Sequence, residues 1–142
     1  MGRYTNFVQW IPMKVAIKIF LQHGTQYVFS PGRRELLKSV KTTGSLKQAA
    51  IEINTSYRWA WQRLHETERE LGRALLERTD EPINGRPLVL TAEAEALLRW
   101  LDTVEKQVHI CLQQADKNLP QFLANSPTRN QDKETAIRFI LD

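Results

Sequence analysis

Apolar and polar residues alternate along residues 15–29, with a break at His23-Gly24. A period of two on both sides of an X-Gly pair predicts a β-hairpin whose turn is formed by His23 and Gly24. We therefore interpret His23 as a turn residue rather than as a ligand. Residues 1–12 show no such pattern and are interpreted as a leader. The alternating apolar positions are Val15, Ile17, Ile19, Leu21, Tyr27 and Phe29.

Helical spacing of the apolar positions replaces this alternation after residue 30. Ser30-Pro31 combines a favoured N-cap with a proline at the first helical position, and Gly44 ends this first helix. Ser45-x-x-Gln48 is a capping box that begins a second helix. Asn54 follows at a position where helices commonly end in a left-handed residue, and Ser56 can cap a third helix.

Two helices joined by a tight turn, as residues 44–64 predict, form a helix-turn-helix motif, whose second helix enters a groove of DNA. Helical spacing divides the third helix into two faces and predicts Trp61 on the inward one and Trp59 on the outward one. The inward residues are Tyr57, Ala60, Trp61, Leu64 and Leu71. The outward residues are Arg58, Trp59, Gln62, Arg63 and Glu66.

The outward face carries side chains that suit nucleic acid. Arginine matches guanine or phosphate with two hydrogen bonds, glutamine can pair with adenine, and a serine at a helix start can meet a phosphate. We expect Lys47, Arg58 and Arg63 to anchor phosphates. We expect Tyr57, Trp59 and Gln62 to read bases or DNA shape. The alternative is an ordinary amphipathic helix in which Trp59 is folded under a loop.

Arg33 and Arg34 lie in the first turn of the predicted first helix, where the helix dipole disfavours cations by a few tenths of a kcal/mol. This cost suggests an anionic group nearby. A solvated arginine pair is the alternative that we favour.

A second hairpin is predicted after Leu71-Gly72, from strands at residues 74–79 and 86–90 around a polar loop at residues 80–85. A hairpin after the recognition helix is the layout of a winged helix. Arg86 or Asn84 could then touch the DNA backbone. Asp80 and Glu81 would be repelled there, so this wing is expected to contribute little.

Thr91 caps a last helix that we expect to run to about residue 119, a length of about 42 Å. Its apolar positions recur at steps of three and four, which is typical of a coiled-coil seam. The seam predicts self-association, and packing back on the N-terminal hairpin is the alternative. Residues 120–142 are interpreted as a linker and a short tail. The seam consists of Ala94, Leu97, Leu101, Val104, Val108, Cys111 and Ala115.

Charge and composition narrow the function classes. Residues 1–91 hold fourteen Lys and Arg against eight Asp and Glu, whereas residues 92–142 hold six against eight. A basic front suits a protein that meets phosphates. The single cysteine, Cys111, excludes an internal disulfide and a cysteine-rich zinc site. The absence of a signal-peptide pattern and of a membrane-spanning run predicts a cytoplasmic protein. We find no nucleophile–base pair, paired carboxylates or phosphate loop, and so expect no enzyme.

Several of these motifs resemble one family across about residues 13–119. The matching elements are Pro31-Gly32-Arg33, Leu36-Leu37, Gly44-Ser45-Leu46, Ala49-Ala50, Ser56-Tyr57-Arg58-x-Ala60-Trp61, Leu76-Glu77-Arg78 and Leu90-Thr91. They are similar to the N-terminal domain of the ModE family of molybdate-responsive transcriptional regulators, which are relatives of the LysR-type winged helices. The resemblance implies a dimer on a pseudo-palindromic operator. It implies DNA contacts at the positions of Ser56, Tyr57, Arg58, Gln62 and Arg63, and packing at Ala60 and Trp61.

The chain departs from that family in its wing, in its turn and in its C-terminal part. The wing loop has Gly85 alone where the family is glycine-rich, and Asn54 stands where a glycine is usual. Full-length members continue into Mop domains that sense molybdate or tungstate. Residues 126–131 are similar to the opening of such a domain, but only eleven residues follow them. We therefore expect no cofactor and no oxyanion binding by this chain.

Together these features predict a mainly α fold with a small β component, a winged helix-turn-helix with an N-terminal β-hairpin and a long C-terminal dimerisation helix. The expected parts are residues 1–12, 13–90, 91–119 and 120–142. The expected function is a homodimeric transcriptional regulator of double-stranded DNA, a repressor, without a metal. A dimeric protein-interaction module with vestigial DNA binding is the alternative. The candidate DNA-contacting residues are Ser45, Lys47, Ser56, Tyr57, Arg58, Trp59, Gln62, Arg63 and Arg86. The candidate dimerisation residues are Leu97, Leu101, Val104, Val108 and Cys111.

Overall fold

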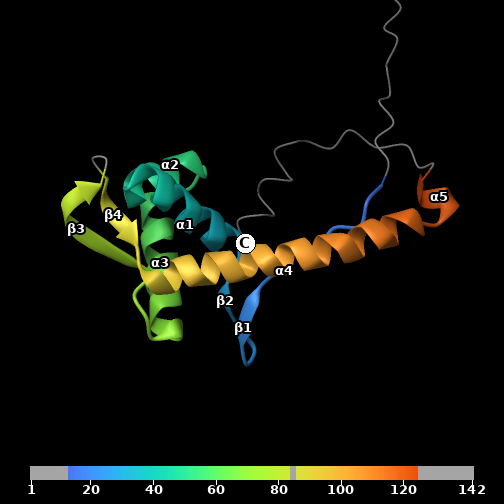
Figure 1. Cartoon of the computed structure of the whole chain (residues 1–142), viewed down its shortest axis with the longest axis horizontal. Helices are drawn as coiled ribbons and strands as arrows, with labels where there is room; N and C mark the ends of the chain where they lie inside the picture. Colours follow the sequence, from blue (N-terminus) through green and yellow to red (C-terminus); the bar gives the residue numbers. More distant parts are fainter. Residues whose placement is uncertain (1–12, 84–85, 125–142) are drawn as a thin grey trace, which may run out of the picture.

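The computed structural model describes residues 13–83 and 86–124, with the side chains of residues 81–83 and 86 left outside the description. Three helices and a two-stranded sheet gather at one end of a long helix, which extends well beyond them (Figure 1). The predicted fold class, mainly α with small β hairpins, is confirmed. The elements in chain order are β1 (Leu21–His23), β2 (Gln26–Phe29), α1 (Pro31–Thr43), α2 (Leu46–Glu52), α3 (Tyr57–Leu71), β3 (Leu76–Ile83), β4 (Arg86–Leu90), α4 (Ala92–Lys117) and α5 (Gln121–Ala124).

The N-terminal hairpin is present but shorter than predicted. Strands β1 and β2 pair antiparallel, with Leu21 opposite Phe29 and His23 opposite Gln26. His23 is therefore the last residue of β1 and not a turn residue, which corrects the prediction. Gly24 has a φ of 61°, so the turn begins one residue later than the alternation suggested. Residues 13–20 form no strand, although the backbone N–H of Val15 donates to a carboxylate oxygen of Asp116 on α4 at 2.9 Å.

Serine caps begin helices α1, α2 and α3, as the sequence predicts. The hydroxyl of Ser30 accepts from the backbone N–H of Arg33 at the start of α1. Ser45 and Ser56 do the same at the starts of α2 and α3, with distances of 3.2 and 3.1 Å. Asn54 has a φ of 56° and turns the chain between α2 and α3, as predicted.

The core lies where α1, α2, α3, the wing strands and the first turns of α4 meet. Ala49 and Ala50 are completely buried, so α2 approaches its neighbours closely, as the small side chains predict. Leucines of α1 and the wing fill the centre. The core residues are Phe29, Leu36, Leu37, Val40, Ala49, Ala50, Ala60, Leu64, Leu75, Leu90, Ala94, Leu98 and Leu101.

The second hairpin forms the predicted wing beside α3. Strands β3 and β4 pair antiparallel with Leu76 opposite Leu90, and β3 extends to Ile83, through part of the predicted loop. The backbone N–H of Leu88 donates to the carbonyl of Gly44 at 3.2 Å, which attaches the wing to the turn between α1 and α2. Asn84 and Gly85 lie outside the described residues.

Helix α4 runs from Ala92 to Lys117, about 39 Å, and Thr91 caps it as predicted. Its buried residues are Ala94, Leu98 and Leu101, so its first turns complete the core of the winged helix. A single turn of helix, α5, lies at the start of the segment that we interpreted as a linker. Residues 1–12 and 125–142, which include the similarity to a Mop domain, lie outside the described part of the chain.

Candidate nucleic-acid interface

Helix α3 buries one side in the core and exposes the other. Ala60, Leu64 and Thr67 recur at steps of four and three, and all three are buried. Tyr57 and Arg58, at the first two helical positions, are exposed. The first turn of α3 is therefore exposed to solvent, while its cap and the buried residues that follow hold it in place.

The two tryptophans of α3 face opposite to the prediction. Trp59 is partly buried and packs against the core, whereas the side chain of Trp61 is 49% exposed. The centre of the buried face is Ala60, so each tryptophan lies about 100° from it, on opposite sides. Strand β2 contacts α3, and Tyr27 of this strand lines the same cavity as Trp59. Because helical spacing alone cannot show which side the hairpin covers, the assignment of Trp59 as outward and Trp61 as inward was wrong.

Two of the predicted DNA-contacting side chains are engaged within α3. Gln62 donates to one carboxylate oxygen of Glu66 at 3.0 Å, and Arg63 donates to the other at 3.0 Å. Burial opposes ionisation of Glu66, but the hydrogen bonds from Gln62 and Arg63 prevail and lower its pKa. Arg63 also lies over the Trp59 ring, 5.9 Å from its centroid. Contact of Gln62 or Arg63 with DNA would require these bonds to be exchanged or shared.

The arginine pair of α1 is not solvated, which corrects the interpretation that we favoured. Arg33 donates to the carbonyl of Val28, to the hydroxyl of Thr67 and to Glu66 on α3. Arg34 donates to Asp102 and Glu105 on α4. Both side chains are only 12% exposed. The anionic groups that their position suggested are carboxylates of this chain.

The remaining candidates differ in what they offer a ligand. Lys47 and Arg58 are exposed and make no ion pair with any described residue. The hydroxyls of Ser45 and Ser56 accept the capping hydrogen bonds. Arg86 begins β4, and its side chain is outside the description. Of the candidate residues, the exposed cations without an ion pair to a described residue thus lie at the starts of α2 and α3.

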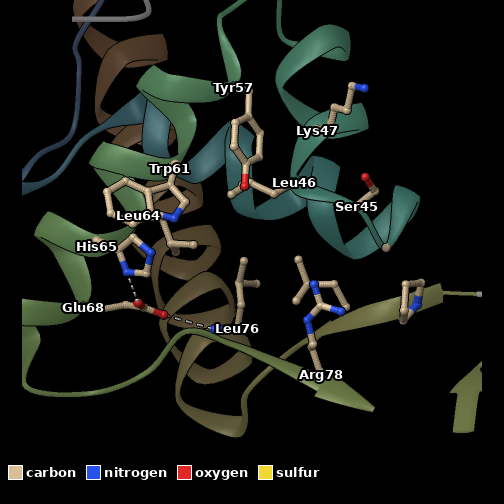
Figure 2. Close-up of a pocket in the computed structure, with 13 residues that line it drawn as sticks. Ser45, Leu46, Lys47, Tyr57, Trp61, Leu64, His65, Glu68, Leu76 and Arg78 are labelled. Atoms are coloured by element: carbon tan, nitrogen blue, oxygen red, sulfur yellow. Dashed lines mark hydrogen bonds and ion pairs between the residues drawn. The ribbon is translucent and has the colours of Figure 1, made fainter. Parts of the chain in front are cut away.

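A groove separates α3 from the wing, and we name it the wing groove (Figure 2). It has a volume of about 470 Å³. Leucines from α2, α3, β3 and β4 form its floor, namely Leu46, Leu64, Leu76 and Leu88. Its wall on α3 consists of Tyr57, Trp61 and His65, and the exposed cations Lys47 and Arg78 also line it.

The site residues predicted from the sequence do not include Trp61, His65 or Arg78. Tyr57, Trp61 and His65 recur at steps of four, so an aromatic stripe was visible in the sequence. Its exposure was not, because Trp61 was counted with the inward residues. Arg78 lies opposite Leu88 in the wing, a pairing that only the register of β3 and β4 defines.

Two features are absent from the described part of the chain. Within it, no helix is long and apolar enough to cross a membrane. The same residues contain no group of three or more His, Cys, Asp or Glu side chains that could hold a metal ion.

The motif, its caps and its wing agree with a family match. Residues 33–95 match the family described as "Bacterial regulatory helix-turn-helix protein, lysR family". This segment begins within α1, includes α2, α3, β3 and β4, and ends in the first turn of α4. Residues 33–95 are therefore similar to the helix-turn-helix domain of LysR-type regulators.

The chain is also similar to one curated regulator. The transcriptional regulator ModE of Haemophilus influenzae (strain ATCC 51907 / DSM 11121 / KW20 / Rd) is 35% identical to it over 111 residues. The alignment covers 71% of this chain and 44% of ModE, so the chain spans less than half the length of that relative. These two matches confirm the resemblance inferred from the sequence. They are to regulatory proteins rather than to enzymes, which confirms that expectation as well.

Solved structures share the fold. The crystal structure of the CbnR_DBD–DNA complex superposes with a TM-score of 0.51 at 20% identity, covering 65% of this chain and all of that one. The BenM_DBD/catB site 1 DNA complex has a TM-score of 0.48 at 21% identity, covering 66% of this chain and 99% of that one. The first of these likenesses confirms the winged helix-turn-helix arrangement.

Proposed function

We propose that this chain binds double-stranded DNA through the start of α3 and acts as a transcriptional regulator. The observation that carries the proposal is the exposed group of Lys47, Tyr57 and Arg58 on two capped helices of a domain similar to those of LysR-type regulators. Residues at the start of a recognition helix are the ones that reach base edges in a helix-turn-helix complex. The likeness to the solved CbnR_DBD–DNA complex supports the same ligand.

Each exposed side chain has a distinct part in this proposal. Lys47 binds a phosphate as a point charge, while Arg58 binds either a phosphate or a guanine edge with two hydrogen bonds. Tyr57 contacts a base or a sugar. Gln62 is exposed and reads an adenine once it exchanges its bond to Glu66. Arg63 strengthens DNA binding through its positive charge. Trp59 supports the side of α3 on which Arg63 lies.

We propose further that the chain is a homodimer that pairs through α4. Beyond the core contacts, one side of α4 next to the buried residues carries exposed or half-buried apolar side chains. They include Leu97, Trp100, Val104 and Cys111, and Trp100 is 53% exposed. This stripe lies about 95° around the helix from the buried face. A second copy of α4 would cover it, together with Val108, while Leu101 stays in the core.

Dimerisation would determine the symmetry of the operator. Two recognition helices related by a two-fold axis bind half-sites about one helical turn apart, which predicts a pseudo-palindromic operator. Occupancy of that operator would repress transcription. The resemblance to the ModE family of molybdate-responsive regulators leads us to propose that the regulated operon serves molybdate or tungstate transport.

Selection from a random pool of duplex DNA tests this proposal. We expect the wild-type chain to enrich a pseudo-palindromic site and Arg58→Ala to enrich it less or to relax one base position. Enrichment of no sequence by a chain that still forms a dimer would contradict the proposal. That result would favour the protein-interaction module instead.

A further inference from the structure

The wing groove contains an exposed aromatic wall, of which the proposed contacts use Tyr57 and leave Trp61 unused. Trp61 is 49% exposed and Tyr57 is 52% exposed, and both belong to α3. Exposure of two large aromatic rings side by side on a small domain costs free energy, because apolar surface stays in contact with water. Such exposure is typical of a surface that a partner covers.

The orientation of Trp61 is defined by neighbouring side chains. Its indole meets the ring of His65 edge to face, with centroids 4.1 Å apart. Nδ1 of His65 lies 3.3 Å from a carboxylate oxygen of Glu68 (Figure 2). The other oxygen of Glu68 accepts from the backbone N–H of Leu75 at 2.8 Å and of Leu76 at 3.4 Å. A chain of contacts therefore connects the start of the wing to Trp61.

The charges around the wing groove suit a polyanion. Lys47 and Arg78 are exposed cations that line it, and neither makes an ion pair with a described residue. The carboxylate that lines it, Glu68, is occupied by two backbone N–H groups and His65. A ligand that enters would meet an apolar floor, an aromatic wall and two positive charges. A deoxyribose–phosphate strand has the matching parts, since its sugar is apolar on one side and its phosphates are negative.

We propose that one strand of duplex DNA passes through the wing groove and that Trp61 contacts its sugar–phosphate backbone. This inference rests on the proposed function, because it places the backbone between a recognition helix and a wing that both face DNA. Trp61 lies one turn after Tyr57, about 6 Å farther along α3, on the side that faces the wing. Its ring packs on a deoxyribose, and its indole N–H can donate to a phosphate oxygen. Such a contact adds affinity without reading sequence.

Binding of Trp61 variants to two duplexes tests the inference. The probes are a duplex selected by the wild-type chain and a scrambled duplex of equal length and composition. We expect Trp61→Ala to weaken binding to both duplexes by about tenfold, which is the loss expected when one hydrogen bond to a charged phosphate is removed. The ratio of the two affinities should stay unchanged. Trp61→Phe keeps an aromatic face and loses the N–H, so its affinity should fall between those of the wild type and Trp61→Ala. Trp61→Phe also preserves most of the apolar volume, so the test remains valid if Trp61→Ala does not fold.

A matched control and a second variant sharpen the result. Phe122→Ala removes an exposed aromatic ring on α5, outside the wing groove, and should leave the affinity unchanged. His65→Ala should produce part of the Trp61→Ala loss, and the two changes should be non-additive, because His65 acts through Trp61.

The outcomes separate this inference from the proposed function. Wild-type binding that survives unchanged in Trp61→Ala and Trp61→Phe overturns the inference and leaves DNA binding intact. A change in the affinity ratio of the two duplexes overturns the assignment to the backbone, because Trp61 would then read bases. Failure of the wild type to bind either duplex overturns both proposals.

Discussion

Arg34 on α1 donates hydrogen bonds to Asp102 on α4, sixty-eight residues farther along the chain. The same guanidinium donates to Glu105 at 2.7 Å. The Arg34 side chain is 12% exposed, whereas the side chains of Asp102 and Glu105 are 47% and 58% exposed. The contact attaches α4, the helix proposed for dimerisation, to α1. It adds to the packing of Ala94, Leu98 and Leu101 of α4 in the core.

The Arg34 contact predicts acid sensitivity. Hydrogen bonds from Arg34 lower the pKa of Asp102 and of Glu105 below their ordinary values of 3.8 and 4.5. A carboxyl whose pKa is lowered by folding stabilises the folded state above its unfolded pKa and loses that contribution as the pH falls through the lowered value. The contribution should be complete above about pH 5 and decline toward pH 3. Because both carboxylates are partly exposed, each should contribute less than about 1 kcal/mol.

Urea unfolding between pH 7 and pH 3 measures this effect. The double variant Asp102→Asn/Glu105→Gln should show a shallower fall of the unfolding free energy than the wild type. Glu77→Gln, which changes an exposed wing carboxylate without an ion pair among the described residues, is the control and should follow the wild-type curve. Equal curves for the double variant and the wild type would show that the Arg34 contact contributes nothing.

Glu68 predicts a specific weakness of the wing. Its carboxylate accepts from the backbone N–H groups of Leu75 and Leu76, so Glu68→Ala leaves those donors without their partner. We expect a loss of about 1–3 kcal/mol in the free energy of unfolding. Glu68→Gln keeps an accepting oxygen and should lose less. Glu70 lies on the same helix, is exposed and makes no hydrogen bond to a described residue, so Glu70→Ala should lower the free energy of unfolding only slightly. A decrease as large as that of Glu68→Ala would contradict the role of Glu68 in holding the wing.

Arg58 is expected to contribute directly to DNA binding. Arg58→Ala should weaken specific binding by about 1–3 kcal/mol if the side chain contacts a base edge. Arg69→Ala removes an equally exposed arginine from the last turn of α3 and serves as the control. Fluorescence anisotropy on the selected duplex measures both. An Arg58→Ala affinity equal to that of Arg69→Ala would remove Arg58 from the interface.

The stripe on α4 predicts where the dimer can be disrupted. Val104→Glu places a charge on the half-buried apolar stripe and should shift the chain toward monomer, because an unpaired charge in an apolar interface is costly. Thr103→Glu places the same charge on an exposed position one residue away and should leave the dimer intact. Sedimentation equilibrium distinguishes them. A wild-type chain that sediments as a monomer would contradict pairing through α4.

The sequence predicted best the features that depend on neighbouring residues. Ser30, Ser45 and Ser56 cap helices through hydrogen bonds three residues away, and Asn54 takes its left-handed conformation within a tight turn. These interactions are written in short spacings that a sequence displays directly. The order of helices and wing followed from them.

Features that depend on distant residues were predicted less well. Trp59 and Trp61 are equivalent by helical spacing, and only the packing of β2 against α3 determines which is covered. Arg33 and Arg34 were predicted to be solvated because their partners, Glu66, Asp102 and Glu105, lie 33 to 71 residues away. The wing groove was missed for the same reason, since four separate elements contribute its floor.

The salt dependence of DNA affinity tests the central claim most directly. A dimer whose subunits each neutralise about four phosphates should show a log–log slope of affinity against salt concentration near −7. The measurement requires only the wild-type chain, its selected duplex and a series of salt concentrations. A steep slope of that size is the result that we predict. An affinity that does not change with salt would contradict the account of this chain as a DNA-binding regulator.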